Sequence, residues 1–136
     1  MPPTDVALSD VSISDAAEAT GVSVHTLRYY EREGLMLGRI PRASSTHRRY
    51  RPEDLNWVGF LTKLRSTGMP INQMRAYADL VRRGGGNEAA RLEILMAHRE
   101  RVLGQMAEMQ RNLDTINFKI DLYRECTSTP TNGACP

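Results

Sequence analysis

An apolar heptad pattern in the last third of the chain limits the possible folds more than any other feature of the sequence. From position 92 to position 123, the residues at alternating steps of three and four are apolar, and Arg99 is the exception. A helix of this length spans ~50 Å at about 1.5 Å per residue, and no globular part of the chain remains to cover its stripe. The pattern therefore predicts a helix that pairs with a second copy of the chain, through Leu92, Leu95, Val102, Met106, Met109, Leu113, Ile116, Ile120 and Tyr123.

Two short helices are expected near the start of the chain, which at 136 residues has room for one small compact domain before the long helix. Ser14 can cap a helix that ends at Gly21. Ser23 can cap a second helix, from Val24 to Glu33, that Gly34 closes. Two helices joined by a tight turn that contains glycine are typical of a helix-turn-helix.

The second of these helices has an apolar side and a basic side. At ~100° per residue, its inner side carries Val24, Leu27, Tyr30 and Glu31. The opposite side carries His25, Arg28, Tyr29 and Arg32. Residues 25–51 hold seven arginines and two glutamates, a local charge of +5 in a chain whose net charge is +2. Such a concentration of charge favours a nucleic-acid partner, and the alternative is a solvated charged helix.

The segment between residues 35 and 50 loses the helical period. Arg39 and Ile40 are expected to face residues 48–50 across a turn at 44–46, as a hairpin that extends the basic surface. A third helix is expected from Pro52 to Gly68, and a fourth begins at Ile71 or Asn72. The three glycines at 84–86 end the fourth helix and mark a domain boundary.

The stretch from Gly21 to Leu35, followed by His47-Arg-Arg-Tyr50, Asp54-Leu55 and Leu64-Arg-Ser-Thr-Gly68, closely resembles the MerR family of bacterial transcription regulators. The resemblance implies a mainly α fold: a winged helix-turn-helix, a second helix pair and a long antiparallel dimerisation helix. We accordingly divide the chain into a flexible N-terminus (1–11), a DNA-binding domain (12–83), a linker and coiled-coil helix (84–125) and a C-terminal tail (126–136).

The resemblance also implies which residues contact DNA. His25, Arg28 and Tyr29 would enter the major groove, and residues of the wing would hold the flanking phosphates. Ser23 could add a phosphate site made of backbone amides. The expected set of DNA contacts is Ser23, His25, Arg28, Tyr29, Arg32, Arg48, Arg49 and Tyr50.

Members of this family distort promoter DNA in response to an effector, so that RNA polymerase can engage it. The resemblance therefore implies a homodimeric regulator whose partners are promoter DNA, RNA polymerase and an effector. The alternative is an architectural DNA-binding protein without a sensor. Catalysis is not expected, because His25, His47 and His98 have neither paired carboxylates nor a thiol near them in sequence.

The two cysteines, Cys126 and Cys135, follow the predicted long helix. Their placement resembles the loop of metal-sensing MerR proteins, and two thiolates suit Cu(I) or another soft metal better than Zn(II), which normally takes four donors. A disulfide and a passive tail are the alternatives. The long helix also resembles that of small MerR proteins that respond to aldehydes or thiol stress. Some of those carry a cysteine in the third helix, and residues 60–64 contain none.

No run of 18 apolar residues occurs, and Met1 to Asp10 lacks the positive and apolar regions of a secretion signal. We therefore expect a cytoplasmic protein without a membrane partner, and the resemblance implies that it is bacterial.

Overall fold

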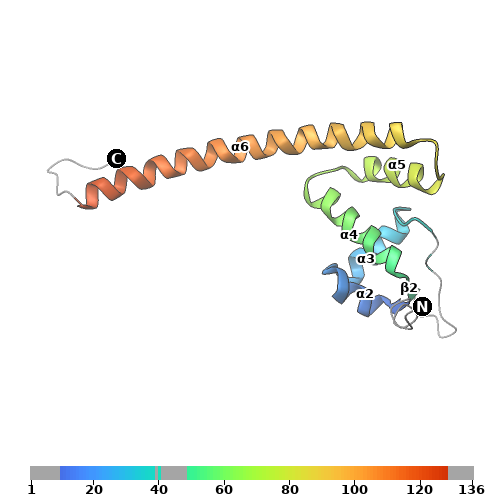
Figure 1. The fold of residues 1–136 in the computed structure, drawn as a ribbon. Helices are drawn as coiled ribbons and strands as arrows, with labels where there is room; N and C mark the ends of the chain where they lie inside the picture. Colours follow the sequence, from blue (N-terminus) through green and yellow to red (C-terminus); the bar gives the residue numbers. More distant parts are fainter. Residues whose placement is uncertain (1–9, 39, 41–48, 129–136) are drawn as a thin grey trace, which may run out of the picture. The chain divides into compact units, whose positions relative to one another are not determined.

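The computed structural model describes residues 10–38, 40 and 49–128. These residues form five helices and two short strands (Figure 1). In chain order the elements are β1 (Val11–Ser12), α2 (Ile13–Thr20), α3 (Val24–Arg32), β2 (Arg49–Tyr50), α4 (Pro52–Ser66), α5 (Ile71–Arg82) and α6 (Glu88–Ser128). The expected mainly α class, with a helix-turn-helix and a long C-terminal helix, is confirmed.

The two helices of the helix-turn-helix are capped by serine side chains. The hydroxyl of Ser23 accepts a hydrogen bond from the amide of Thr26 at 3.0 Å and begins α3, as the sequence predicts. The predicted cap of α2 was wrong by two residues, because Ser12 rather than Ser14 caps it and accepts from the amide of Asp15 at 3.2 Å. Ile13, which follows this cap, is buried and fixes the start of the helix in the core.

The described strands pair differently from the expected hairpin. β2 lies antiparallel to β1, with Val11 opposite Tyr50 and Ser12 opposite Arg49. Ile40 belongs to no strand, and the other residues of the expected wing, Arg39 and 41–48, lie outside the described residues. Strand β1 was not predicted from the sequence, because a strand of two residues is too short to show an alternating pattern.

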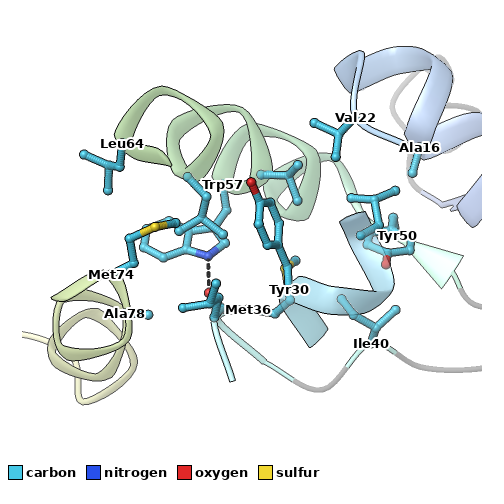
Figure 2. Close-up of a cluster of buried hydrophobic side chains, with 14 of the residues drawn as sticks. Ala16, Val22, Tyr30, Met36, Ile40, Tyr50, Trp57, Leu64, Met74 and Ala78 are labelled. Carbon is cyan, nitrogen blue, oxygen red and sulfur yellow. Dashed lines mark hydrogen bonds between the residues drawn. The ribbon is translucent and has the colours of Figure 1, made fainter. Parts of the chain in front are cut away.

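The core of the first unit, which runs to Met96, lies where α2, α3 and α4 meet (Figure 2). Ala16, Leu27, Val58 and Leu61 are fully buried there. Helix α5 adds Met74 and Ala78 to the same core (Figure 2). Burying one large apolar side chain contributes roughly 1.5–3 kcal/mol, so this cluster fixes α3 against the neighbouring helices from one side.

Helix α6 contributes to both units of the chain. Ile94 and Leu95, in its first two turns, pack against the core of the first unit, and the second unit begins at Ala97. The boundary therefore falls after the glycines at 84–86, because the start of α6 belongs to the first core. Helix α6 also extends to Ser128, past the expected end at residue 125. Within the described residues, no helix has the length and apolar character needed to cross a bilayer.

Candidate nucleic-acid interface

The recognition face of α3, which we define as His25, Arg28, Tyr29 and Arg32, lies opposite the side that packs in the core. Leu27 and Tyr30 are buried, as predicted from the helical spacing. The side chains of His25, Arg28 and Arg32 are exposed, and Tyr29 is half-buried with its ring 6.3 Å from that of Tyr30. One helix thus combines a fixed apolar side with an open basic side.

The cations of this surface have no acidic partners in the described part of the chain. There, the side chains of His25, Arg28, Arg32 and Arg49 form neither a hydrogen bond nor an ion pair. Several arginines elsewhere are paired with carboxylates, for example Arg83 with Asp79 at 2.9 Å. An unneutralised guanidinium offers all of its donors to a phosphate or a guanine edge.

The N-terminus of α3 adds a second feature that suits an anion. Ser23 is exposed, and its hydroxyl is bonded within the helix start, to the amide and the hydroxyl of Thr26, both at 3.0 Å. The amides of Val24 and His25 precede the first helical hydrogen bond, which runs from Leu27 to the carbonyl of Ser23. Ser23 therefore acts as a cap, and the backbone amides beside it are the groups that a phosphate could use.

Tyr50 does not lie where the sequence analysis expected it. Its side chain is fully buried, and its hydroxyl donates a hydrogen bond to the carboxylate of Glu31. The expected phosphate contact of Tyr50 is therefore wrong for this structure, because the ring would have to leave the core to reach DNA. Arg49, its neighbour on β2, is exposed, and Arg48 lies outside the described residues.

Glu31 has a structural role in this surface that was not predicted from the sequence. It lies on the inner side of α3 and ties the recognition helix to β2 through Tyr50. A carboxylate on an otherwise apolar helix side needs a polar partner in the core. That requirement was visible in the sequence and could have pointed to a buried tyrosine.

The seam of α6, defined as the apolar residues at the heptad positions from 92 to 123, is largely uncovered. Met106, Met109 and Ile116 are 62%, 69% and 56% exposed. Leu95 and Val102 are half-buried, and the rest of the seam is exposed: Leu92, Leu113, Ile120 and Tyr123. Three further exposed apolar residues, which the heptad pattern did not include, lie beside or opposite the seam: Met96, Leu103 and Phe118.

Cys126 lies in the last turns of α6 rather than in a tail. It is half-buried and disulfide-bonded, so its sulfur is not a thiolate in this structure. Cys135 lies outside the described residues. Among residues 10–38, 40 and 49–128, no three His, Cys, Asp or Glu side chains gather as a metal site.

Comparison with known protein families gives two matches that together span most of the described chain. Residues 11–80 match the family described as "MerR HTH family regulatory protein". Residues 55–117 match the family described as "MerR, DNA binding".

The individual relatives cover between 81% and 95% of this chain. An uncharacterized HTH-type transcriptional regulator from Haemophilus influenzae is 34% identical over 110 residues, which are 81% of each chain. A mercuric resistance operon regulatory protein from Pseudomonas fluorescens is 28% identical and covers 95% of this chain and 85% of its own. The crystal structure of HiNmlR, described as a MerR family regulator lacking the sensor domain and bound to promoter DNA, aligns with a TM-score of 0.80 and 30% identity, over 88% of this chain and 89% of that one.

Proposed function

The chain belongs to the MerR family of helix-turn-helix transcription regulators, and from this membership we propose that it binds promoter DNA as a homodimer through the recognition face of α3. The family consists of DNA-binding regulators, not enzymes. The proposal places the chain at promoters in the cytoplasm.

The observation that carries the proposal is the open basic side of α3. A helix of this kind fits the major groove, where Arg28 can bind a guanine edge or a phosphate with two parallel hydrogen bonds. His25 lies one turn nearer the N-terminus and is assigned to a base edge, and the hydroxyl of Tyr29 to the DNA backbone. Arg32, Arg48 and Arg49 are assigned to phosphates. The structurally similar HiNmlR was crystallised bound to promoter DNA, which supports promoter DNA as the partner.

Dimerisation is assigned to the seam of α6. An exposed apolar stripe of this length is unstable in water, and a second copy of the same helix is a partner of matching pattern and length. The antiparallel sense follows the family. Two recognition helices carried by one stiff dimer then read two half-sites, as the two-fold symmetry of such a dimer requires.

Regulation is assigned to distortion of the promoter by the dimer, which lets RNA polymerase engage it. The energy of DNA deformation can act as the switch, because bending a site of 20–30 base pairs costs roughly 1–6 kcal/mol. The alternative, an architectural binder without a sensor, predicts DNA bending that no effector alters. A ligand-switched regulator predicts that transcription from the bound promoter changes when the effector is added.

A soft metal at Cys126 and Cys135 is proposed only for the reduced chain. The cytoplasm keeps most thiols reduced, and two thiolates can hold Cu(I) in a near-linear geometry. The disulfide at Cys126 does not fit metal binding in the oxidised state. Anaerobic titration of the reduced protein with Cu(I) against a chelator tests the assignment. Tight binding that Cys126→Ser abolishes supports a metal sensor, and equal weak binding by both proteins removes the metal from the proposal.

The recognition face is tested by Arg28→Ala. We expect operator binding to weaken by ~1–3 kcal/mol, because a charged bidentate contact is lost. Arg111→Ala is the matched control, since it removes one exposed positive charge from α6. Arg111 is paired with Glu108. Titration of a labelled operator at moderate salt gives both affinities. Equal affinities for the Arg28→Ala variant and the wild type would refute the proposed face.

A further inference from the structure

Within the described part of the chain, the four consecutive backbone carbonyls that follow the recognition helix accept no hydrogen bond from a backbone amide. Gly34 has a φ of 72°, and the amides of Gly34 and Leu35 bond back to the carbonyls of Glu31 and Tyr30 at 3.2 and 3.0 Å. This pattern closes the helix and satisfies its own last carbonyls. The next carbonyls in the chain, those of residues 33–36, must find donors elsewhere.

All four carbonyls accept hydrogen bonds from side chains of the second helix pair, α4 and α5. Arg75 donates from Nε to the carbonyl of Glu33 at 2.9 Å. Arg82 donates from Nη1 to the carbonyls of Gly34 at 2.8 Å and Met36 at 2.7 Å. Trp57 donates from Nε1 to the carbonyl of Leu35 at 2.7 Å (Figure 2).

These contacts join segments that are distant in sequence and come from two different helices. Trp57 lies on α4, 22 residues from its acceptor, whereas Arg75 and Arg82 lie on α5, 42 to 48 residues from theirs. Arg75 also pairs with the carboxylate of Glu33. Donors on two helices fix the segment in more than one direction, so α3 cannot turn against α4 and α5 without breaking several charge-assisted bonds.

Packing holds the side chain of Trp57 in a fixed position. It is buried, and its ring stacks on that of Tyr77 from α5 with 5.9 Å between centroids and 7° between planes. The same tryptophan therefore links α4, α5 and the end of α3. A movement of the second helix pair can change the orientation of the recognition helix only if the linkage between them is rigid.

We propose that Trp57, Arg75 and Arg82 are positioning residues that hold residues 33–36 and so set the orientation of the recognition helix on DNA. This inference rests on the proposed function, because it requires α3 to be the element that reads DNA. The side chains act through the backbone of 33–36 and not by touching DNA.

A direct phosphate contact is the competing role for an arginine on this surface. The side chain of Arg82 is 30% exposed, so the two roles must be separated by measurement. A lost phosphate contact lowers affinity for all DNA alike and reduces the slope of log K against log salt by about one. A lost positioning contact lowers affinity for the operator alone and leaves that slope unchanged, since the number of neutralised phosphates stays the same.

The first test compares Arg82→Ala with Arg83→Ala by titration of operator and non-specific duplex over a range of salt. Arg83 is a matched control, because it pairs with Asp79 and makes no contact with residues 33–36. We expect Arg82→Ala to reduce the ratio of operator to non-specific affinity about 5- to 20-fold with an unchanged salt slope, and Arg83→Ala to preserve the ratio. Equal effects of the two variants, or a reduced salt slope for Arg82→Ala, would overturn the assignment.

The second test removes a donor without changing the charge. Trp57→Phe deletes the indole N–H and keeps an aromatic ring against Tyr77, and Phe60→Leu, from the same aromatic cluster, is its control. Both are measured below their unfolding transitions. We expect a lower ratio of operator to non-specific affinity for Trp57→Phe alone. An unchanged ratio in Trp57→Phe overturns the positioning role, whereas an unchanged affinity in Arg28→Ala would instead refute the proposed function.

Discussion

Burial distinguishes the tyrosine and histidine side chains that stabilise this fold from those that we expect to contact DNA. Tyr29 and Tyr50 both lie in or near the basic region of the sequence, yet one is on the recognition face and the other is fully buried against Glu31. The assignment of Tyr29 and Tyr30 to opposite sides followed from helical spacing alone. Tyr50 could not be placed from sequence, because it follows a run of basic residues and its strand partner β1 was not predicted.

Loss of the hydroxyl should therefore affect stability at Tyr50 and DNA binding at Tyr29. Tyr50→Phe should lower the free energy of unfolding by about 1–2 kcal/mol, since a hydrogen bond to the half-buried carboxylate of Glu31 is lost, and should leave operator affinity nearly unchanged below the transition. Tyr29→Phe should do the reverse. Urea unfolding and operator titration of both variants check this. Weaker DNA binding by a fully stable Tyr50→Phe would show that the ring leaves the core to bind phosphate.

His98 gives the unfolding free energy a dependence on pH. Its side chain is buried on α6, and burial, with a smaller contribution from Arg101, lowers its pKa below the ordinary value of 6.5. The unfolded chain then binds this proton more readily, so stability is complete above about pH 6.5 and falls as the pH drops towards the folded pKa. Chemical unfolding at fixed protein concentration should show a smaller loss between pH 7 and pH 5.5 in His98→Gln. The exposed His25→Gln should match the wild type, and an identical loss in His98→Gln would contradict the assignment.

At the scale of helices and strands, the sequence predicted where helices begin and end better than it predicted the sheet. Pro52 at the first position of α4 and Gly21 and Gly34 after α2 and α3 acted as expected, because each suits one backbone conformation. Ser12 and Ser14 are both good caps, so only packing of Ile13 decides between them. The side-chain donors to residues 33–36 were not predictable, because their partners are 22 to 48 residues away.

Two glycines should respond to alanine with opposite signs. Gly34 has a positive φ of 72°, which strains any residue with a Cβ, so Gly34→Ala should destabilise the protein by about 1–2 kcal/mol. Gly59 lies within α4, where an added Cβ meets no atom within 4 Å, so Gly59→Ala should stabilise it by about 0.5–1 kcal/mol. Urea midpoints of the two variants test this. A stabilised Gly34→Ala would mean that the end of α3 adopts another conformation in solution.

For the whole molecule, the heptad pattern predicted the length and the exposed stripe of α6, but the domain division required the structure. Leu95 follows the heptad pattern like the residues after it, and nothing in its spacing shows that it packs, together with Ile94, against the first core.

A charged residue placed in the seam tests whether a second copy of the chain covers it. Ile116→Asp should convert the dimer to a monomer in sedimentation at micromolar concentration. Phe118→Asp, on the opposite side of α6 and similarly exposed, should remain a dimer. Dimers in both variants would exclude the seam as the interface.

We propose that two copies of this chain read a promoter together through their recognition helices. This is tested by sedimentation of the wild-type protein with a duplex from the DNA upstream of its own gene and with a shuffled duplex of equal length. We predict two protomers on each upstream duplex, with affinity at least ~10³-fold higher than for the shuffled sequence at physiological salt. Equal affinity for the two duplexes, or one protomer on each, would rule out promoter recognition by a dimer.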